Sequence, residues 1–384
     1  MTPLNINNTP LRPFEPMVLD CLGEISSAIL KSPVGRQFPD LTAFAFYVRK
    51  ANLQKLGSAL QPDEARLGRG LCFHIAPANI PINFAFTWVF SLLAGNANIV
   101  RLPSKDFPQV EALLSIINAV LEKFPELRER NAFVKYPRTD NEATAAYCLM
   151  ADCRMIWGGD KTIATIKSLP TLPRCVDICF ADRYSVAMIN GEAVISADEV
   201  QLSRLAEGFY NDTYLMDQNA CSSPQVILWE NDSSVARERF WNAVELRVRR
   251  KYVLQDAVAV DKYTLFCEEA VRNMSVERVT QKGNLIYRIE LNALPKDIVG
   301  HRGRGGFFFE YALKNRKEFF DVVTEKFQTI TQFGVDPGLL RDAVISSNLR
   351  GVDRIVPIGQ AMAIGVMWDG HDLVRELSRF TSTS

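Results

Sequence analysis

A cysteine in a polar turn is the residue of this sequence with the sharpest potential for covalent chemistry. Cys221 stands in the segment DQNACSSPQ, between a helical pattern and a strand-like run. A thiol in such a turn can be exposed, and its thiolate can attack a carbonyl carbon. A lone cysteine is more often a small apolar core residue, so spacing alone leaves both interpretations open. We expect the core role for Cys72, Cys148, Cys153, Cys175, Cys179 and Cys267.

An asparagine is the second residue that could act on a carbonyl group. Asn79 lies in the segment PANIP, where a strand-like run ends and a long apolar helical pattern begins. Its side chain could cap that helix. It could equally aim its amide N–H into a cleft, as a donor to a developing oxyanion. The residues alone leave both roles open.

The composition excludes several classes of function. The chain of 384 residues holds only three histidines, far apart in sequence, so metal catalysis and histidine-based hydrolysis have little to work with, and we expect no metal. Lys and Arg number 44 against 44 Asp and Glu, which removes the broad basic surface of a nucleic-acid-binding protein. The start of the chain lacks a signal-peptide pattern and no CxxC pair occurs, so we expect a reduced, cytoplasmic protein.

The first half of the chain alternates strand-like and helical patterns. The strand-like runs are residues 72–76, 97–102, 132–136, 154–157 and 175–181, and the helical patterns between them are residues 80–95, 107–123, 140–150 and 160–169. This alternation predicts a doubly wound parallel sheet, whose ligands bind beyond the carboxyl ends of the strands. The apolar run 80–93 is too short to span a membrane, so we expect a buried helix there and no membrane span.

Flanking patterns extend this α/β organisation. We expect a docking helix from Asp40 to Gly57 and a capping box formed by Ser196 and Glu199. Further along, the patterns indicate helices at 234–250 and 315–326 and strands at 226–229, 307–313 and 328–332. These elements suit a second α/β domain.

Two segments together resemble the aldehyde dehydrogenase superfamily. The run FHIAPANIPINFAFTWVFSLLAGNANIVRLPSK resembles the part that builds its dinucleotide site, and DQNACSSPQ resembles its nucleophile turn. More closely, four ordered blocks are similar to the LuxC-type acyl-CoA reductases, which include fatty-acid reductases. These blocks are YVRKANL, DQNACSSPQ, FQTITQFGV and VDRIVPIGQAM followed by WDGHDL, between residues 47 and 373.

The resemblance implies an aldehyde dehydrogenase-like fold and a role for each candidate. In this superfamily the cysteine, here Cys221, attacks the carbonyl, while an asparagine amide, here Asn79, and the cysteine's own N–H hold the oxyanion. Oxidising members also use a strand glutamate to activate water, and the comparable segment, residues 179–189, has none. An acyl-enzyme should therefore survive for reduction or exchange with a thiol. The nearest carboxylate, Asp182, could substitute as a base, although a surface role is commoner.

The resemblance also implies a cofactor site. It places the cofactor against Pro77, Ala78, Arg101, Ser104, Lys105, Gly158 and Gly159. NAD-preferring relatives often have a glutamate where Lys105 falls, and a lysine should instead attract a 2′-phosphate, which favours NADPH. The backbone N–H groups of Gly158 and Gly159, at the start of a helix, could bind a pyrophosphate. The alternative is that these glycines only form an ordinary turn between a strand and a helix. The basic loop 301–306 could touch a phosphate or be a solvated connection. Glu310 invites comparison with the relatives' ribose-binding glutamate, but it falls within a strand.

The sequence therefore favours NADPH-dependent reduction of an acyl-CoA to an aldehyde through a cysteine-bound thioester. We expect a cofactor domain of residues 1–203 and 350–384 and a thiol-bearing catalytic domain of residues 204–349. A typical thiol is mostly protonated near neutral pH, so we expect the site to lower the pKa of Cys221. The alternatives are an acyl transferase or thioesterase using the same cysteine, and a non-catalytic acyl- or cofactor-binding subunit of a reductase complex. The donor is an acyl-CoA or an acylated protein, with an acyltransferase or synthetase as a possible partner, and relatives suggest a homo-oligomer.

Overall fold

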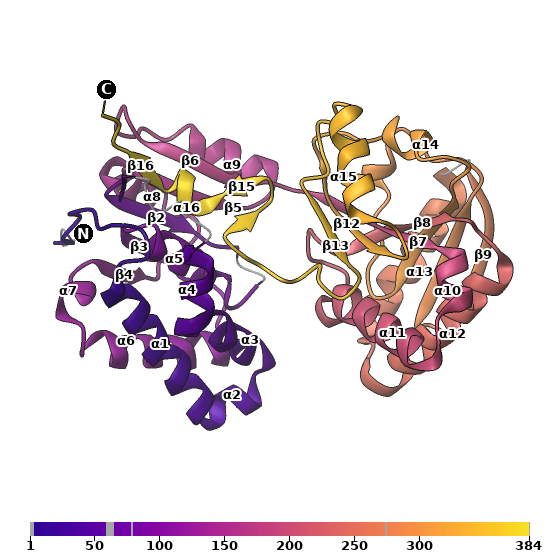
Figure 1. Cartoon of the computed structure of the whole chain (residues 1–384), viewed down its shortest axis with the longest axis horizontal. Helices are drawn as coiled ribbons and strands as arrows, with labels where there is room; N and C mark the ends of the chain where they lie inside the picture. Colours follow the sequence, from indigo (N-terminus) through magenta and orange to yellow (C-terminus); the bar gives the residue numbers. More distant parts are fainter. Residues whose placement is uncertain (1–3, 59–64, 78–79, 273–274, 384) are drawn as a thin grey trace. The chain divides into compact units, whose positions relative to one another are not determined.

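The computed structural model describes residues 4–58, 65–77, 80–272 and 275–383. It divides the chain into two compact units, Met1–Ala181 with His371–Ser384, and Asp182–Gly370. Both units are α/β structures (Figure 1).

The first unit is built on a parallel sheet, which within the described residues has five strands. Their order is β4 (Asn131–Val134), β3 (Ala97–Arg101), β2 (Leu71–Ile75), β5 (Cys153–Trp157) and β6 (Val176–Phe180). The intervening helices are α5 (Asn83–Leu93), α6 (Pro108–Leu121), α7 (Pro125–Arg128), α8 (Asn141–Met150) and α9 (Asp160–Lys167). The doubly wound parallel sheet predicted from sequence is confirmed, and its strand order reverses between β2 and β5.

Helices cover both faces of this sheet because apolar residues line it on both sides. One core packs α5 and α6 against the N-terminal helices α1 (Pro16–Lys31), α2 (Pro33–Gln37), α3 (Pro39–Tyr47) and α4 (Lys50–Ser58). The other core packs α8 and α9 against β2 and β3. The end of the chain returns to this unit as β15 (His371–Asp372), α16 (Leu373–Glu376) and β16 (Ser378–Phe380), which pairs antiparallel with β1 (Arg66–Gly68).

The second unit contains a mixed sheet, whose described strands number seven. Their order is β13 (Arg354–Pro357), β12 (Phe327–Phe333), β7 (Tyr184–Asn190), β8 (Pro224–Glu230), β11 (Phe307–Ala312), β10 (Ile286–Leu291) and β9 (Val276–Lys282). Neighbouring strands are parallel, except that β9 runs antiparallel to β10. The short β14 (Met367–Trp368) follows β13 in the chain.

Successive residues of β7 face opposite cores, as the pleat of a strand requires. Val186 and Met188 pack with α13 (Asp256–Arg272), α14 (Lys317–Phe320) and α15 (Pro337–Ser346). Ala187 and Ile189 pack with α10 (Gly191–Ser196), α11 (Glu199–Thr213) and α12 (Ser234–Lys251). The strands are therefore buried on both faces, which explains their near-continuous apolar runs.

The units divide the chain at positions other than the expected 203/204 and 349/350. β7 pairs with β8 and β12, so the chain joins the second sheet from residue 182. β13 pairs with β12, so residues 354–357 belong to the second sheet, and the second unit extends to residue 370. Strand pairing therefore places β7 and β13 in the second unit.

Four local predictions are corrected. The segment 179–189 is two strands in different sheets, because β6 ends at Phe180 and β7 begins at Tyr184. The docking helix is broken into α3 and α4, with Asp40 inside the first turn rather than capping it. The capping box lies at Asp198 and Gln201, two residues beyond its predicted start. The helix expected at 315–326 is confined to α14, since the β-branched residues that follow disfavour a helix.

The apolar run near residue 80 forms α5, which is buried almost all round. In the part of the chain that the structure describes, no helix has the length and apolarity needed to cross a bilayer.

Candidate active site

Cys221 lies in a tight turn between a 3-10 helix, Tyr214–Met216, and the first residue of β8. Asp217 and Gln218 adopt left-handed backbone conformations, with φ of 49° and 63°, and these reverse the chain before the thiol. The Ser185 hydroxyl at the start of β7 donates to the Cys221 carbonyl oxygen at 2.7 Å. The turn is thus held by the strand beside it, and Cys221 as a whole residue is half-buried.

The turn that carries Cys221, residues 217–223, is called the thiol turn below. Gln218 in this turn and Gln225 at the start of β8 connect it to the loop that precedes β11. Gln218 Oε1 accepts from the backbone N–H groups of Gly306 at 3.3 Å and Phe307 at 3.2 Å, and its Nε2 donates to the Phe307 carbonyl at 2.9 Å. Gln225 Oε1 accepts from the Gly303 N–H at 2.8 Å, and its Nε2 donates to the Gln218 carbonyl at 3.0 Å. The thiol turn and this loop therefore form one hydrogen-bonded structure.

The surroundings of the thiol act on its ionisation in both directions. Burial raises the pKa of Cys221 and the negative charge of Asp369 raises it further, whereas a hydrogen bond from Gln328 and the positive charge of Arg183 lower it. Asp369 is buried, accepts from Gln328 Nε2 at 2.9 Å and pairs with Arg183 at 2.9 Å. The net effect in this unit is a raised pKa, opposite to the lowered pKa expected from sequence.

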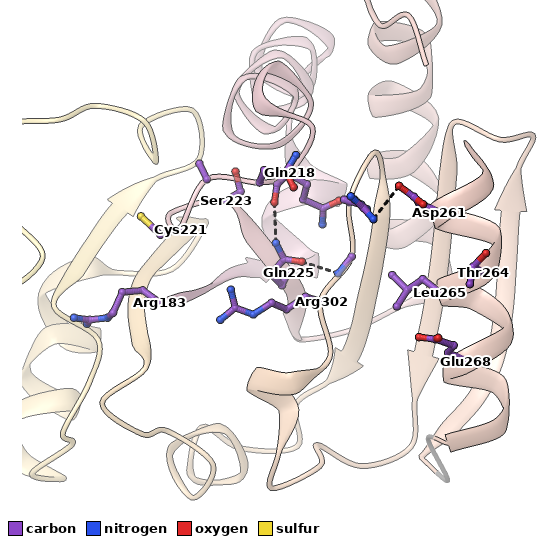
Figure 2. A pocket seen from close by; sticks show the side chains of 14 residues that line it. Arg183, Gln218, Cys221, Ser223, Gln225, Asp261, Thr264, Leu265, Glu268 and Arg302 are labelled. Carbon is purple, nitrogen blue, oxygen red and sulfur yellow. Dashed lines mark hydrogen bonds and ion pairs between the residues drawn. The ribbon is translucent and has the colours of Figure 1, made fainter. Parts of the chain in front are cut away.

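Cys221 is one of the residues that line a cavity of about 480 Å³, which is formed by residues of the second unit and is called the thiol pocket below. Figure 2 shows Cys221 at one side of it, α13 residues at the other and Arg302 between them. The α13 residues lining it are Asp261, Thr264, Leu265 and Glu268. Polar and charged groups thus make up much of its wall.

The two carboxylates considered from sequence are both occupied by protein contacts. Asp182 accepts two hydrogen bonds from Arg302, at 2.9 and 3.0 Å, so this residue has the surface ion-pair role rather than that of an available base. Glu310 is buried and accepts from Trp229 and Trp241 at 2.9 and 2.7 Å, and from a third donor, an arginine on β10. Its carboxylate stabilises the core and does not face a cofactor.

A second cavity, of about 590 Å³, lies in the first unit beyond the carboxyl ends of β2, β3 and β5, and is called the first-unit pocket below. It brings together six residues that the resemblance assigned to the cofactor: Pro77, Arg101, Ser104, Lys105, Gly158 and Gly159. Ala78 and Asn79 lie outside the described residues. The residues assigned through the resemblance therefore make up nearly half of this pocket's described lining.

The first-unit pocket is electropositive. The Arg101 guanidinium lies over the Tyr136 ring, 4.6 Å from its centroid, and the Lys105 ammonium lies 5.2 Å from the Phe107 centroid. Arg138 is a third cation of the lining, and no carboxylate contributes to the described part of the wall. Sequence analysis missed Arg138, although its position just beyond a predicted strand end was a usable signal.

The glycines of this pocket stand at the start of α9. Gly159 is the residue before the helix, and no side chain caps it there. A side chain at Gly158 would press against Thr162 at 3.1 Å, whereas the position of Gly159 is open. A helix start without a capping side chain leaves room for an anionic ligand at its backbone amides.

The sequence also missed three residues around the thiol, namely Arg183, Gln328 and Asp369. Gln328 and Asp369 lie in FQTITQFGV and WDGHDL, two of the blocks that carried the resemblance, so those blocks were the available signal. Arg183 had no such signal.

The remaining thiols and imidazoles have structural surroundings. Cys72, Cys148 and Cys153 are buried as expected, while Cys175 and Cys179 are half-buried, and Cys267 is exposed, so the core role predicted for Cys267 is wrong. Each histidine contacts a protein group: His74 contacts Thr87 and Asn98, His301 contacts Glu269, and His371 contacts Glu376. Among the residues described, no cluster of His, Cys, Asp or Glu could hold a metal ion.

Comparison with solved structures defines the class of fold. The chain resembles the bifunctional proline utilization A (PutA) protein (TM-score 0.63, 15% identity), over 95% of this chain and 42% of that one, so it spans about two fifths of that protein. It also resembles a putative aldehyde dehydrogenase PutA from Anabaena variabilis (0.62, 12%), over 95% and 86% of the two chains. A third is an NAD-dependent benzaldehyde dehydrogenase from Corynebacterium glutamicum (0.60, 10%), over 95% and 82%. The fold is that of the aldehyde dehydrogenases.

The family follows from the sequence itself. The model of the acyl-CoA reductase (LuxC) family matches residues 54–263, more than half of the chain and including the thiol turn. The chain therefore belongs to the LuxC acyl-CoA reductase family. A search of curated proteins gives no match.

Proposed function

We propose that this protein reduces an acyl-CoA to an aldehyde with NADPH, through a thioester on Cys221. The observation that carries the proposal is Cys221, a half-buried cysteine in a hydrogen-bonded turn that lines a cavity, within a chain of the LuxC family. The first unit supplies a separate pocket whose lining suits a dinucleotide.

Each step assigns a task to this chain's residues. The Cys221 thiolate bonds to the thioester carbonyl carbon, and CoA leaves as a thiolate that takes up a proton. Asn79, with the Cys221 N–H, is the proposed donor to the oxyanion. NADPH, when bound, supplies a hydride to the carbonyl carbon. Collapse of the hemithioacetal releases the aldehyde and returns the Cys221 thiolate.

The first-unit pocket fits NADPH better than NADH. Arg101, Lys105 and Arg138 present three positive charges, and the described lining offers no carboxylate that would repel a 2′-phosphate. The uncapped start of α9, with Gly158 and Gly159, would hold the pyrophosphate. We therefore propose this pocket as the cofactor site.

The contacts of Asp182, the carboxylate considered from sequence as a base, support reduction over hydrolysis. Asp182, the nearest carboxylate considered, has both oxygens bound by Arg302. With its carboxylate held by Arg302, Asp182 is not the available base that hydrolysis would require of it, and the proposal is that the thioester awaits a hydride or another thiol.

An assay of the purified chain tests this proposal. With a fatty acyl-CoA it should consume NADPH and release CoA and aldehyde in equal amounts. Cys221→Ala should lose at least about a thousandfold of this activity, because the nucleophile is gone. Cys267→Ser is the matched control, since it removes an exposed thiol outside the thiol pocket and should leave the rate unchanged.

The same assay separates the alternatives. CoA release without NADPH consumption would indicate an acyl transferase or thioesterase. Binding of ligands without release of CoA would indicate a non-catalytic subunit. An acylated partner protein offered in place of acyl-CoA tests the second donor class, and activity only with such a donor would transfer the proposal to a complex with an acyltransferase or synthetase.

A further inference from the structure

Two arginines of the loop before β11 line the same cavity as the nucleophile, and the proposed chemistry gives neither of them a task. Arg302 and Arg304 contribute to the wall of the thiol pocket together with Cys221 (Figure 2). The sequence left this loop undecided between phosphate binding and a solvated connection. Its position in the thiol pocket makes the first role testable.

The loop that carries these arginines is fixed in place. Gly305 and Gly306 have φ of 61° and 90°, which glycine adopts without strain. The buried ammonium of Lys262, on α13, donates to the Gly305 carbonyl at 2.8 Å. Together with the bonds from Gln218 and Gln225, these contacts hold the loop backbone against the thiol turn. The two guanidinium groups therefore extend from a preorganised support, which reduces the entropy lost on binding.

The ion pairs of these arginines are exchangeable. Arg302 pairs with Asp182, the two side chains being 35% and 49% exposed, and Arg304 pairs with Asp261 at 2.9 Å, the two being 49% and 44% exposed. Exposed pairs contribute little to stability, so a ligand anion can replace the carboxylate at small cost. Arg183, a third arginine of this pocket, is different, because the side chain of its partner Asp369 is only 2% exposed.

We propose that Arg302 and Arg304 form a phosphate-binding subsite of the thiol pocket, which holds the nucleotide phosphates of a ligand that must reach Cys221. This inference rests on the proposed function, because that function defines two such ligands. The CoA part of the donor must bring its thioester to the sulfur, and the nicotinamide cofactor must bring its hydride to the same carbon. Phosphate oxygens match the planar fork of a guanidinium, which makes two parallel hydrogen bonds to them.

Calorimetry tests the subsite without turnover. The probes are NADPH and desulfo-CoA, which has the CoA phosphates but lacks the reactive thiol. Arg304→Ala should weaken the binding of one of them about tenfold, the loss expected for a charged hydrogen bond. Asp261→Asn should strengthen the same binding, because it removes the competing carboxylate. Arg341→Ala is the matched control, an exposed arginine of the same unit outside the pocket.

The two sources of phosphate give different results. If CoA occupies the subsite, Arg304→Ala weakens the binding of desulfo-CoA alone and raises KM for acyl-CoA. KM for acyl-pantetheine is then unchanged, because this donor lacks the nucleotide. If the cofactor occupies the subsite, Arg304→Ala weakens the binding of NADPH, and KM for NADPH rises with either acyl donor. Either pattern supports the subsite, and the second would in addition contradict the assignment of the NADPH phosphates to the first-unit pocket.

Unchanged affinity for both probes in Arg302→Ala and Arg304→Ala would overturn the subsite. Weaker binding in Asp261→Asn as well as Arg304→Ala would also overturn it, because it would show that the ion pair has only a structural role. A wild-type chain that binds these probes but never releases CoA from acyl-CoA would instead contradict the proposed function.

Discussion

The two pockets of this protein lie at opposite ends of their parallel strands. In the first unit the pocket lies beyond the carboxyl ends of β2, β3 and β5. In the second unit the thiol pocket lies at the amino ends, where Arg183 precedes β7, Cys221 precedes β8 and Arg302 precedes β11. The first arrangement follows the general rule for α/β sheets, and the second does not.

The difference shows how each pocket obtains its polar groups. At a carboxyl end, a loop and the start of a helix supply backbone amides, so glycines and a few cations suffice. At an amino end no helix start is available, and side chains must hold the nucleophile turn and set its charge. Gln218, Gln225 and Gln328 have those tasks here.

Removing one turn glutamine should have the largest effect on the thiol pocket. Gln218→Ala leaves buried backbone groups of Gly306, Phe307 and Pro224 without their partner, and each such group costs about 1–3 kcal/mol. We expect the free energy of unfolding to fall by about 3 kcal/mol and acylation of Cys221 to slow strongly. Denaturant unfolding and single-turnover CoA release measure the two effects.

Gln281→Ala on the edge strand β9 is the control, since this side chain is exposed. A Gln218→Ala variant as stable as this control would show that the thiol turn does not depend on side-chain anchoring, and the contrast between the pockets would fail.

A charge reversal in the first-unit pocket should have the next largest effect. Lys105→Glu replaces a cation of that pocket with a carboxylate, which repels a 2′-phosphate and accepts hydrogen bonds from ribose hydroxyls. We expect KM for NADPH to rise about thirtyfold, with KM for NADH unchanged or lower, as loss of a charge-assisted contact plus repulsion requires.

Lys55→Glu, at an exposed position on α4, should leave both KM values unchanged. An unchanged preference for NADPH in Lys105→Glu would remove the first-unit pocket as the site of the 2′-phosphate.

Neutralising the carboxylate near the thiol should have the smallest effect. The charge of Asp369 disfavours the Cys221 thiolate and so raises its pKa. Asp369→Asn should therefore lower that pKa, and the reaction with iodoacetamide should reach its maximum rate at lower pH.

The rate of alkylation, followed against pH in a Cys267→Ser background, measures this shift. Asp342→Asn, on the exposed face of α15, is the control. A shift of the profile to higher pH in Asp369→Asn would contradict the assigned electrostatics.

The sequence predicted the first unit closely because its elements alternate with the spacing of βαβ units. Each strand of its parallel sheet, with the helices α5, α6, α8 and α9, was located within a few residues, whereas the short strands β1, β15 and β16 were not predicted. Periodicity indicated that the loops at the strand ends form a cleft, and the resemblance supplied the six residues found in the first-unit pocket.

The thiol pocket was predictable only at its nucleophile. Cys221 was recognisable from its turn, but Arg183, Gln328 and Asp369 reach it from strands and loops more than 30 residues away in sequence, through the pairing of β7, β8 and β12. The boundary near residue 182 was missed for the same reason, since pairing is a tertiary property. Local propensity does not encode which strands meet.

Acylation of Cys221 in the absence of NADPH tests the central claim most directly. The chain, with Cys267→Ser to remove the exposed thiol, is mixed with acyl-CoA, digested and analysed by peptide mass. The account predicts one acyl group on the peptide containing Cys221, one CoA released per chain, and loss of the adduct as aldehyde when NADPH is added. Turnover to aldehyde in Cys221→Ala, or an acyl group bound only at other residues, would contradict it.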